Sequence, residues 1–221
     1  PENLYGEARK NSRGIDFANE IELQQLEDSL KTACAQSYTA TSLINGQPVA
    51  EGEAQAVRNP ADHSDTVGSV VFANAQTATA AIDAALAAQI QWAATPAAER
   101  AGSLKRFADL LEQHTPALMM LAVREAGKTL ANALAEVREA VDFCRYYAHE
   151  AEHTLANHAS GKGVMITISP WNFPLAIFTG ETVAALAAGN TVVAKPAEQT
   201  SLIAHYAVQL MHQAGIPTTA L

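Results

Sequence analysis

Residues 163–200 read GVMITISPWNFPLAIFTGETVAALAAGNTVVAKPAEQT, and this stretch decides the fold. It opens with a β-branched run at Val164–Ile168, continues as an apolar helical segment from about Pro174 to Ala188, and returns to a second apolar run at Thr191–Ala194. A second helical segment follows at Ser201–Ala214. Near-continuous apolar strands that alternate with helices are typical of a parallel sheet covered by helices on both faces. The sequence therefore predicts an α/β fold with a right-handed crossover between the two strands.

A polar segment follows each predicted strand. Ser169-Pro170-Trp171-Asn172 leaves the first strand, and Lys195-Pro196-Ala197-Glu198 leaves the second. Because ligands of open α/β sheets bind at the carboxyl ends of the strands, we expect both segments at one site. The neutral amide of Asn172 is a suitable donor to an oxyanion, and a cation and a carboxylate three residues apart can grip ribose hydroxyls. The alternative for either segment alone is a polar surface turn.

Upstream of this region the sequence predicts a hairpin and a series of helices. The dipeptide Asn45-Gly46 lies within Ser42–Val49 and favours a type I′ turn, because both central residues of that turn need positive φ. Val67–Phe72 is a further strand candidate, and turn residues at Asn59–Asp62 precede it. Helices are expected at Glu20–Ala35, after a cap at Thr77, and after cap-and-proline starts at Thr95-Pro96 and Thr115-Pro116, the last of these helices ending at Gly127.

The longest helical pattern is an apolar stripe whose steps alternate between four and three residues. It predicts one helix of many turns through Leu130, Leu134, Val137, Val141, Cys144, Ala148, Ala151 and Leu155. Residues 1–20 are polar and show little periodicity, so we expect them to form a linker or a strap that lies on another domain.

The composition argues against several classes of protein. The 221 residues are 48% hydrophobic and carry a net charge of −9 with no basic cluster, which argues against nucleic-acid binding. No apolar run approaches the roughly 18 residues of a membrane span. Cys34 and Cys144 form no disulfide framework, and the polar N-terminus lacks the apolar region of a signal peptide. We therefore expect a cytoplasmic protein whose residues contact neither nucleic acid nor membrane.

Three motifs point to other chemistry, and each has a simpler interpretation. His149-Glu150-Ala151-Glu152-His153 matches the H-E-x-x-H zinc motif, but its glutamates indicate a solvated helix face, so we expect no metal. Gly127-Lys128-Thr129 matches the end of a phosphate-binding loop, yet it follows a helix where that loop needs a strand. Cys144 lies on the apolar stripe and Cys34 has no basic neighbour in sequence, so neither is predicted to be a nucleophile.

The order and spacing of these segments resemble the aldehyde dehydrogenase superfamily. The resemblance covers about residues 41–221 and implies the N-terminal portion of a Rossmann-like NAD-binding domain with long helices, preceded by a connector and helix at residues 1–40. The catalytic domain would lie downstream, so the fold is expected to be incomplete. The matching segments are Ile168–Pro174, Ala187–Thr200, Glu125–Lys128 and the hairpin at Asn45-Gly46.

A narrower resemblance, to the proline utilization A family, rests on Pro1–Asp16 and Trp171–Gly180. Members of that family oxidise proline on an FAD barrel and then oxidise L-glutamate γ-semialdehyde to L-glutamate with NAD. The resemblance implies NAD as cofactor, a small aldehyde as substrate, a proline dehydrogenase domain with FAD in the same longer chain, and a homo-oligomer. Peripheral attachment of the longer protein to the inner membrane is left open. The alternatives are an aldehyde dehydrogenase of another substrate class and a non-catalytic assembly module.

The resemblance also implies roles for single residues. Asn172 would be the oxyanion-hole amide, Phe173 would pack on the aliphatic stem of the substrate, and Glu139 would meet its amine. The alternative for Glu139 is a surface residue on the long helix. The cofactor would be bound by Ile168, Ser169, Pro170 and Trp171 in the cleft, by Lys195 and Glu198 on the adenosine ribose, and by Ala197 beside it.

Three parts of the family's machinery have no counterpart among the 221 residues. They are the nucleophilic cysteine, the general-base glutamate and the Gly-x-x-x-Gly cofactor loop. We therefore expect this chain to be a segment of a larger enzyme and to be inactive alone.

Overall fold

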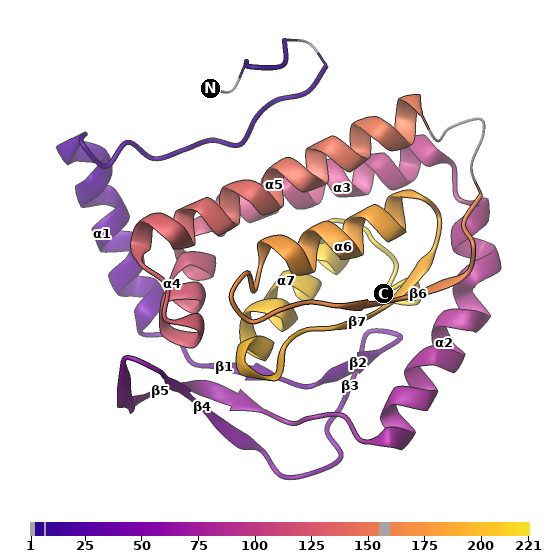
Figure 1. Cartoon of the computed structure of the whole chain (residues 1–221), viewed down its shortest axis with the longest axis horizontal. Coiled ribbons are helices and arrows are strands. Elements are labelled where there is room, and N and C mark those ends of the chain that lie inside the picture. Colours follow the sequence, from indigo (N-terminus) through magenta and orange to yellow (C-terminus); the bar gives the residue numbers. More distant parts are fainter. Residues whose placement is uncertain (1–2, 7, 155–159) are drawn as a thin grey trace.

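The computed structural model describes residues 3–6, 8–154 and 160–221, and Figure 1 shows helices packed around small sheets. The predicted α/β class is confirmed. In chain order the elements are α1 (Glu20–Cys34), β1 (Tyr38–Ala40), β2 (Ser42–Ile44), β3 (Gln47–Val49), β4 (Gln55–Asn59), β5 (Asp62–Val70), α2 (Ala75–Ala94), α3 (Ala97–Gln113), α4 (Thr115–Ala126), α5 (Leu130–His153), β6 (Val164–Ile168), α6 (Ala176–Ala187), β7 (Thr191–Lys195), a 3-10 turn η1 (Glu198–Thr200) and α7 (Ser201–Gln213).

Strands β6 and β7 form a parallel pair, as the sequence predicts. Their register runs from Val164 opposite Thr191 to Ile168 opposite Lys195, and α6 is the crossover between them. The backbone N–H of Ser169 donates a further hydrogen bond of 3.2 Å to the carbonyl of Lys195. The polar segments that follow the two strands therefore start side by side.

The expectation that helices cover both faces of this sheet is wrong along β6. Ile166 and Ile168 are 57% and 67% exposed, whereas Met165 and Thr167, which alternate with them, are partly buried. Because side chains alternate along a strand, one face of β6 carries uncovered isoleucines. Among the described residues, no helix covers this face of β6.

The main core lies where α3, α4 and α5 pack on α6 and α7. Helix α5 lies along α3 and α6, and α7 contacts α3 and α4. Figure 1 shows α6 and α7 between this helical layer and the strands. Phe107 and Leu111 of α3 and Phe178 of α6 are among the largest fully buried side chains. This layer supports the β6–α6–β7–α7 unit from behind.

The apolar stripe predicted for α5 is confirmed from Leu134 to Ala151, and these stripe positions are buried. Leu130 at the start of the helix is 44% exposed. Leu155, the last position of the predicted stripe, lies outside the described residues. The stripe explains why one helix of 24 residues contacts α3, α4 and α6 at once.

The hairpin prediction is confirmed. The sheet that contains β5 has more strands than the sequence predicted. Asn45 and Gly46 have φ of 52° and 75°, as a type I′ turn requires, and they join β2 to β3. Strand β5 starts at Asp62 and ends at Val70, so it extends further upstream than predicted and stops short of Phe72. It pairs parallel with β1 and antiparallel with β4. Sequence reasoning missed both partners, because β1 is only 3 residues long and β4 is largely exposed.

Three predicted threonine caps are wrong. Helix α2 starts earlier than Thr77, and the Asn74 side chain caps it by accepting the Thr77 N–H at 2.8 Å. The hydroxyls of Thr95 and Thr115 donate instead to carbonyls in the last turn of the preceding helix. Thr95 and Thr115 each precede a proline, as many N-terminal caps do. Their hydroxyls nevertheless bind carbonyls of the preceding helix and do not cap the following one. The C-terminal cap of α4 at Gly127 is confirmed, with φ of 67°.

The segment before α1 contacts the helical layer, and the prediction of a linker or a strap on another domain stays a prediction. The Ser12 N–H and hydroxyl donate to the Asp142 carboxylate on α5 at 2.7 and 2.9 Å. The Arg13 N–H donates to Glu112 on α3 at 2.8 Å. Arg145 of α5 donates to Glu112 as well, so one ionic cluster joins the segment to two helices. The division of the chain at residue 40 stays a prediction.

Candidate functional site

The loop after β6 presents several exposed side chains at the carboxyl end of the strand. Trp171 is 54% exposed and Phe173 is 41% exposed, and Asn172 between them is exposed too. Ser169 and Pro174, on either side of the exposed residues, are buried. The buried residues anchor the loop at both ends, so the Asn172 amide projects from a fixed base.

A buried ion pair between Lys128 and Glu136 holds this loop. Lys128 was named from the sequence, but Glu136 was not singled out. The Lys128 Nζ lies 2.5 Å from Glu136 Oε1 and donates to the backbone carbonyl of Asn172 at 2.8 Å. Glu136 Oε2 accepts the N–H groups of Leu175 and Ala176, at 3.2 and 2.9 Å, where α6 begins. The Glu136 side chain is 1% exposed. A charged residue next to the apolar stripe of α5 was the signal in the sequence.

Glu139 lies one helical turn beyond Glu136 on α5, and it is exposed. Partial desolvation raises its pKa, the neighbouring Glu136 charge raises it further, and the Lys128 charge opposes the rise. Glu139 therefore shares its electrostatic surroundings with the pair that holds Asn172. The structure brings this predicted residue to the same side of the molecule as the loop.

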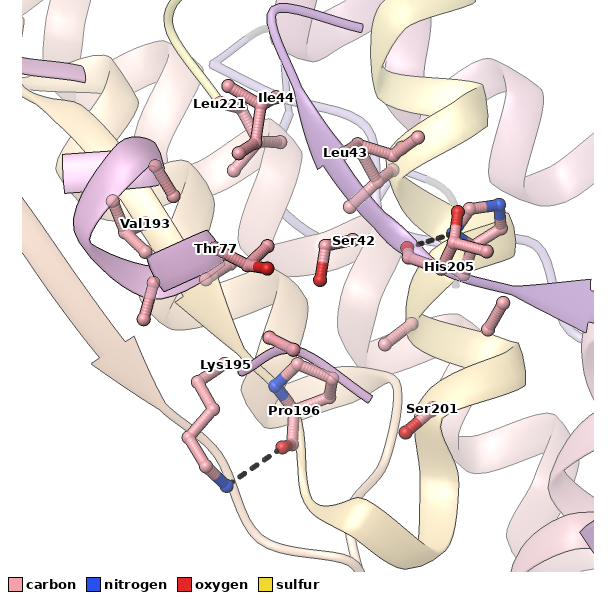
Figure 2. Close-up of a pocket in the computed structure, with 18 of the residues that line it drawn as sticks. Ser42, Leu43, Ile44, Thr77, Val193, Lys195, Pro196, Ser201, His205 and Leu221 are labelled. Carbon is pink, nitrogen blue, oxygen red and sulfur yellow. Dashed lines mark hydrogen bonds between the residues drawn. The ribbon is translucent and has the colours of Figure 1, made fainter. Parts of the chain in front are cut away.

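The second predicted segment lies at the end of β7. Lys195 and Glu198 are both exposed, and the Lys195 Nζ donates to the carbonyl of Pro196 at 3.2 Å (Figure 2). Ala197 precedes the 3-10 turn that begins at Glu198. Since Ile168 is the register partner of Lys195, the two segments meet at one edge of the sheet.

A cavity of about 580 Å³ lies beside β7, between α2, α7 and the hairpin β2–β3. Its lining is mostly apolar and includes Lys195, Pro196 and Glu198, but not the loop Ser169–Phe173. In Figure 2, Lys195 and Pro196 lie at one end of the cavity and Leu221 at the other. The two predicted segments therefore differ: the second borders an apolar cavity, and the first projects from the sheet edge.

Charged side chains hold both ends of the crossover helix α6 and of α7. At the N-terminus of α7, the buried Glu125 carboxylate accepts the N–H groups of Leu202 and Ile203 at 2.7 and 2.9 Å. Burial raises the pKa of Glu125 to about 8, and the two N–H donors oppose this rise. Glu136 occupies the matching place on α6. Acceptor oxygens at helix N-termini satisfy N–H groups that have no partner within the helix.

Arginine side chains donate hydrogen bonds to carbonyls at the C-terminal ends of α6 and α7. Arg100 Nε of α3 donates to the Ala187 carbonyl at the end of α6 at 3.1 Å. Arg106 Nε, one and a half turns along α3, donates to the Ala214 carbonyl after α7 at 2.7 Å. The helices that carry the two site segments are thus fixed at both ends by α3, α4 and α5.

Gly127-Lys128-Thr129 takes the simpler interpretation, and Cys144 is buried as predicted. The His149 and His153 rings stack with centroids 4.1 Å apart, and no group of three His, Cys, Asp or Glu side chains among the described residues could hold a metal ion. Thr129 caps α5 by accepting the Asn132 N–H at 3.3 Å, so Gly127-Lys128-Thr129 is a helix-to-helix connection. Burial strongly raises the pKa of the Cys144 thiol. Among the described helices, none combines the length and apolar character of a membrane span.

The chain belongs to the aldehyde dehydrogenase family, whose model matches residues 48–221. It is 50% identical over 218 residues to the bifunctional protein PutA of Klebsiella aerogenes, covering 98% of this chain and 16% of that protein. Proline utilization A from Bdellovibrio bacteriovorus has a similar structure, with a TM-score of 0.90 and 30% identity over 97% of this chain and 24% of that one.

A 1-pyrroline-5-carboxylate dehydrogenase from Thermus, solved with bound NAD, superposes with a TM-score of 0.87 and 31% identity. The match covers 94% of this chain and 43% of that one. The predicted family and fold are therefore confirmed, including the expectation that the 221 residues correspond to part of the family's fold. The chain spans 16% of the length of its PutA relative.

Proposed function

We propose that this chain is part of an NAD-dependent enzyme that oxidises L-glutamate γ-semialdehyde to L-glutamate. One observation carries the proposal. The β6–β7 register brings an exposed amide, at Asn172, and an exposed Lys195–Glu198 pair to one sheet edge. The similarity to PutA and to a 1-pyrroline-5-carboxylate dehydrogenase supports this substrate. 1-Pyrroline-5-carboxylate is a cyclic imine, and L-glutamate γ-semialdehyde is the open-chain aldehyde that its hydrolysis gives.

The residues at the end of β7 fit a dinucleotide. Lys195 offers a cation and Glu198 a carboxylate at the mouth of an apolar cavity, a donor and acceptor set that suits ribose hydroxyls beside a flat base. Ile168, Ser169, Pro170, Trp171 and Ala197 would form the adjoining wall. When bound, NAD accepts a hydride from the substrate carbon. Lys195 and Glu198 would hold the adenosine ribose of the nucleotide at the end of β7.

Asn172 stabilises the oxygen of the reacting carbonyl. A nucleophile that attacks the aldehyde turns its carbonyl oxygen into an oxyanion, and a fixed amide N–H lowers the energy of that state. Phe173 packs against the aliphatic stem of the substrate, and Glu139 attracts its ammonium group. Cys144 cannot attack, because it is fully buried and its pKa is raised. Cys34 is exposed at the end of α1 and does not line the cavity, so we place the nucleophilic thiol outside these 221 residues.

The whole enzyme extends beyond this segment in the proposal. Residues 1–40 connect the module to a proline dehydrogenase domain that uses FAD, and residues 41–221 open the NAD-binding domain. The enzyme is placed in the cytoplasm and assembles as a homo-oligomer. The 221 residues alone are expected to oxidise no aldehyde.

The test follows NADH formation by the full-length protein that contains this chain. L-glutamate γ-semialdehyde should be oxidised with a kcat/KM at least tenfold above that for a simple aliphatic aldehyde. Asn172→Ala should lower the acylation rate by about 10²–10³, as expected for one lost oxyanion donor. An exposed amide on α5 gives the control, since Asn132→Ala should leave the rate unchanged. A preference for another aldehyde would overturn the substrate, and an unchanged rate in Asn172→Ala would overturn the role of that amide.

A further inference from the structure

A single ammonium group bridges the helical layer and the loop that carries Asn172. The Lys128 Nζ contacts Glu136 Oε1 at 2.5 Å and the Asn172 carbonyl at 2.8 Å. The same ammonium lies 4.6 Å from the centroid of the Phe173 ring. The Lys128 and Glu136 side chains are 12% and 1% exposed, so solvent competes weakly for the ion pair, whereas the hydrogen bond to the Asn172 carbonyl is exposed.

Glu136 completes the connection three residues further along the loop. One of its oxygens accepts the Lys128 ammonium, and the other accepts the N–H groups of Leu175 and Ala176. One ion pair therefore holds residues 172–176 at both ends. Lys128, in the turn before α5, binds the first residue, and Glu136 of α5 binds the last two. A buried carboxylate with three donors is fully compensated, which makes this arrangement rigid.

We infer that Lys128 and Glu136 are positioning residues that fix the Asn172 amide for oxyanion stabilisation. The inference rests on the proposed function. An oxyanion donor accelerates a reaction only if it is aligned before the charge develops. Asn172 is exposed and lies on a loop, so α6 alone does not set its orientation. The charge-assisted hydrogen bond to its carbonyl fixes the peptide from which its side chain projects.

Removing the Lys128 charge should reduce kcat and leave nucleotide binding intact. A displacement of about 1 Å in a catalytic group can cost about 10²-fold in rate, so we expect Lys128→Met to slow acylation between about tenfold and a hundredfold. The KM for NAD should change less than twofold, because Lys128 is not among the residues that line the cavity beside Lys195. A loss of folded protein would also lower the apparent kcat at an unchanged KM, so kcat is expressed per folded enzyme, and the double-mutant cycle separates the two causes.

A double-mutant cycle separates positioning from a purely structural effect. If Lys128 acts through Asn172, the variant Lys128→Met/Asn172→Ala should acylate at the rate of Asn172→Ala alone. If the two losses multiply, the inference is wrong. Because Lys128→Met leaves Glu136 buried without its partner, Lys128→Met/Glu136→Gln is needed as a second variant in which the site carries no net charge. It should show the same loss of kcat with a higher melting temperature than Lys128→Met.

A second ion pair on α5 provides the matched control. Lys105 of α3 contacts Glu152 of α5 at 2.8 Å, at the end of the helix opposite to Glu136, and its side chain is 51% exposed. Lys105→Met in the full-length protein should leave kcat and both KM values unchanged.

The outcomes distinguish this inference from the proposed function. If the wild-type enzyme oxidises another aldehyde but not the semialdehyde, the substrate proposal fails and the cycle is run with that aldehyde. If Asn172→Ala is slow and Lys128→Met is as fast as wild type, the function stands and the positioning role fails. If no aldehyde yields NADH, both fail.

Discussion

At the scale of single residues, position in the fold decides what a charged side chain can do. Glu198 and Glu125 illustrate this. Glu198 is exposed at the end of β7, where it can accept hydrogen bonds from a ligand. Glu125 is buried with both oxygens committed to backbone N–H groups at the start of α7. The first is expected to act in binding, and the second in holding the helix.

Glu198→Ala should raise the KM for NAD by about tenfold in the full-length enzyme, because a hydrogen bond to a charged group contributes about 1.5–3 kcal/mol. The KM for the aldehyde should stay within twofold. Steady-state NADH formation at varied NAD and fixed aldehyde measures this. Gln199→Ala, at the exposed neighbouring position, serves as the control. A rise only in the aldehyde KM would contradict the ribose role of Glu198.

Glu125 should make stability depend on pH in an unusual direction. Its pKa is raised from 4.5 to about 8 in the folded protein, mainly by burial. Folding therefore favours the protonated form, and the contribution of Glu125 to stability is present below about pH 4.5 and lost as the pH rises to about 8. The loss is on the order of 1 kcal/mol per pKa unit.

Thermal unfolding of the full-length protein at pH 5.5 and pH 8 tests this. The melting temperature of the wild type should fall between these two values by more than that of Glu125→Gln, which cannot ionise. Equal falls in the two proteins would show that Glu125 stays ionised in the fold and that the N–H donors outweigh burial.

At the scale of elements, close contact between α5 and α6 depends on a residue without a side chain. A Cβ atom at Gly180 of α6 would lie 2.9 Å from the ring of Phe143 on α5. Gly180→Ala should therefore destabilise the protein by about 1–3 kcal/mol through overpacking, although alanine favours helix formation. A fall in melting temperature by several degrees is the expected result.

Gly102→Ala is the matched control for this prediction. A Cβ at Gly102 of α3 would meet only the flexible end of Arg106, at 3.4 Å. Here the helix propensity of alanine should dominate and raise the melting temperature slightly. If both variants shifted the melting temperature alike, packing against Phe143 would not be the cause.

The elements also show what the sequence could and could not predict. The turn at Asn45-Gly46 and the stripe of α5 follow from local rules, positive φ in one case and helical period in the other, and both are confirmed. The caps at Thr95 and Thr115 failed because a hydroxyl can serve either of two adjoining helices, and the cap at Thr77 failed because Asn74 caps a helix that starts earlier. Strand β4 was missed because its exposed residues show no apolar alternation.

The candidate site shows the same division. The strand ends were predicted to meet, and the register of β6 and β7 confirms it, because parallel pairing follows from the strand–helix–strand pattern. Glu136 was missed because its partners are 39 and 40 residues away, at Leu175 and Ala176, and no local pattern encodes such a contact. The roles of the site residues stay proposals.

At the scale of the whole molecule, the segment before α1 is joined to the helical layer by few groups. Ser12 is fully buried, and the Asp142 carboxylate accepts hydrogen bonds from its backbone N–H and from its hydroxyl. Asp142→Ala should release this segment, so trypsin should cleave after Arg9 and Arg13 several times faster in the full-length protein. Asp109→Ala is the control, because Asp109 is exposed and pairs only with Arg145 among the described residues. Equal cleavage rates in the two variants would contradict the role of Asp142.

The charges at the ends of α6 and α7 bear on the order of events during synthesis. Arg100, Arg106, Glu125 and Glu136 all precede the helices that they hold, by 39 to 108 positions. Chains leave the ribosome from the N-terminus and their early parts can fold first. Helices α6 and α7 therefore each emerge after the acid and the arginine that fix their two ends. Each strand end that carries site residues emerges immediately before the helix that these side chains hold.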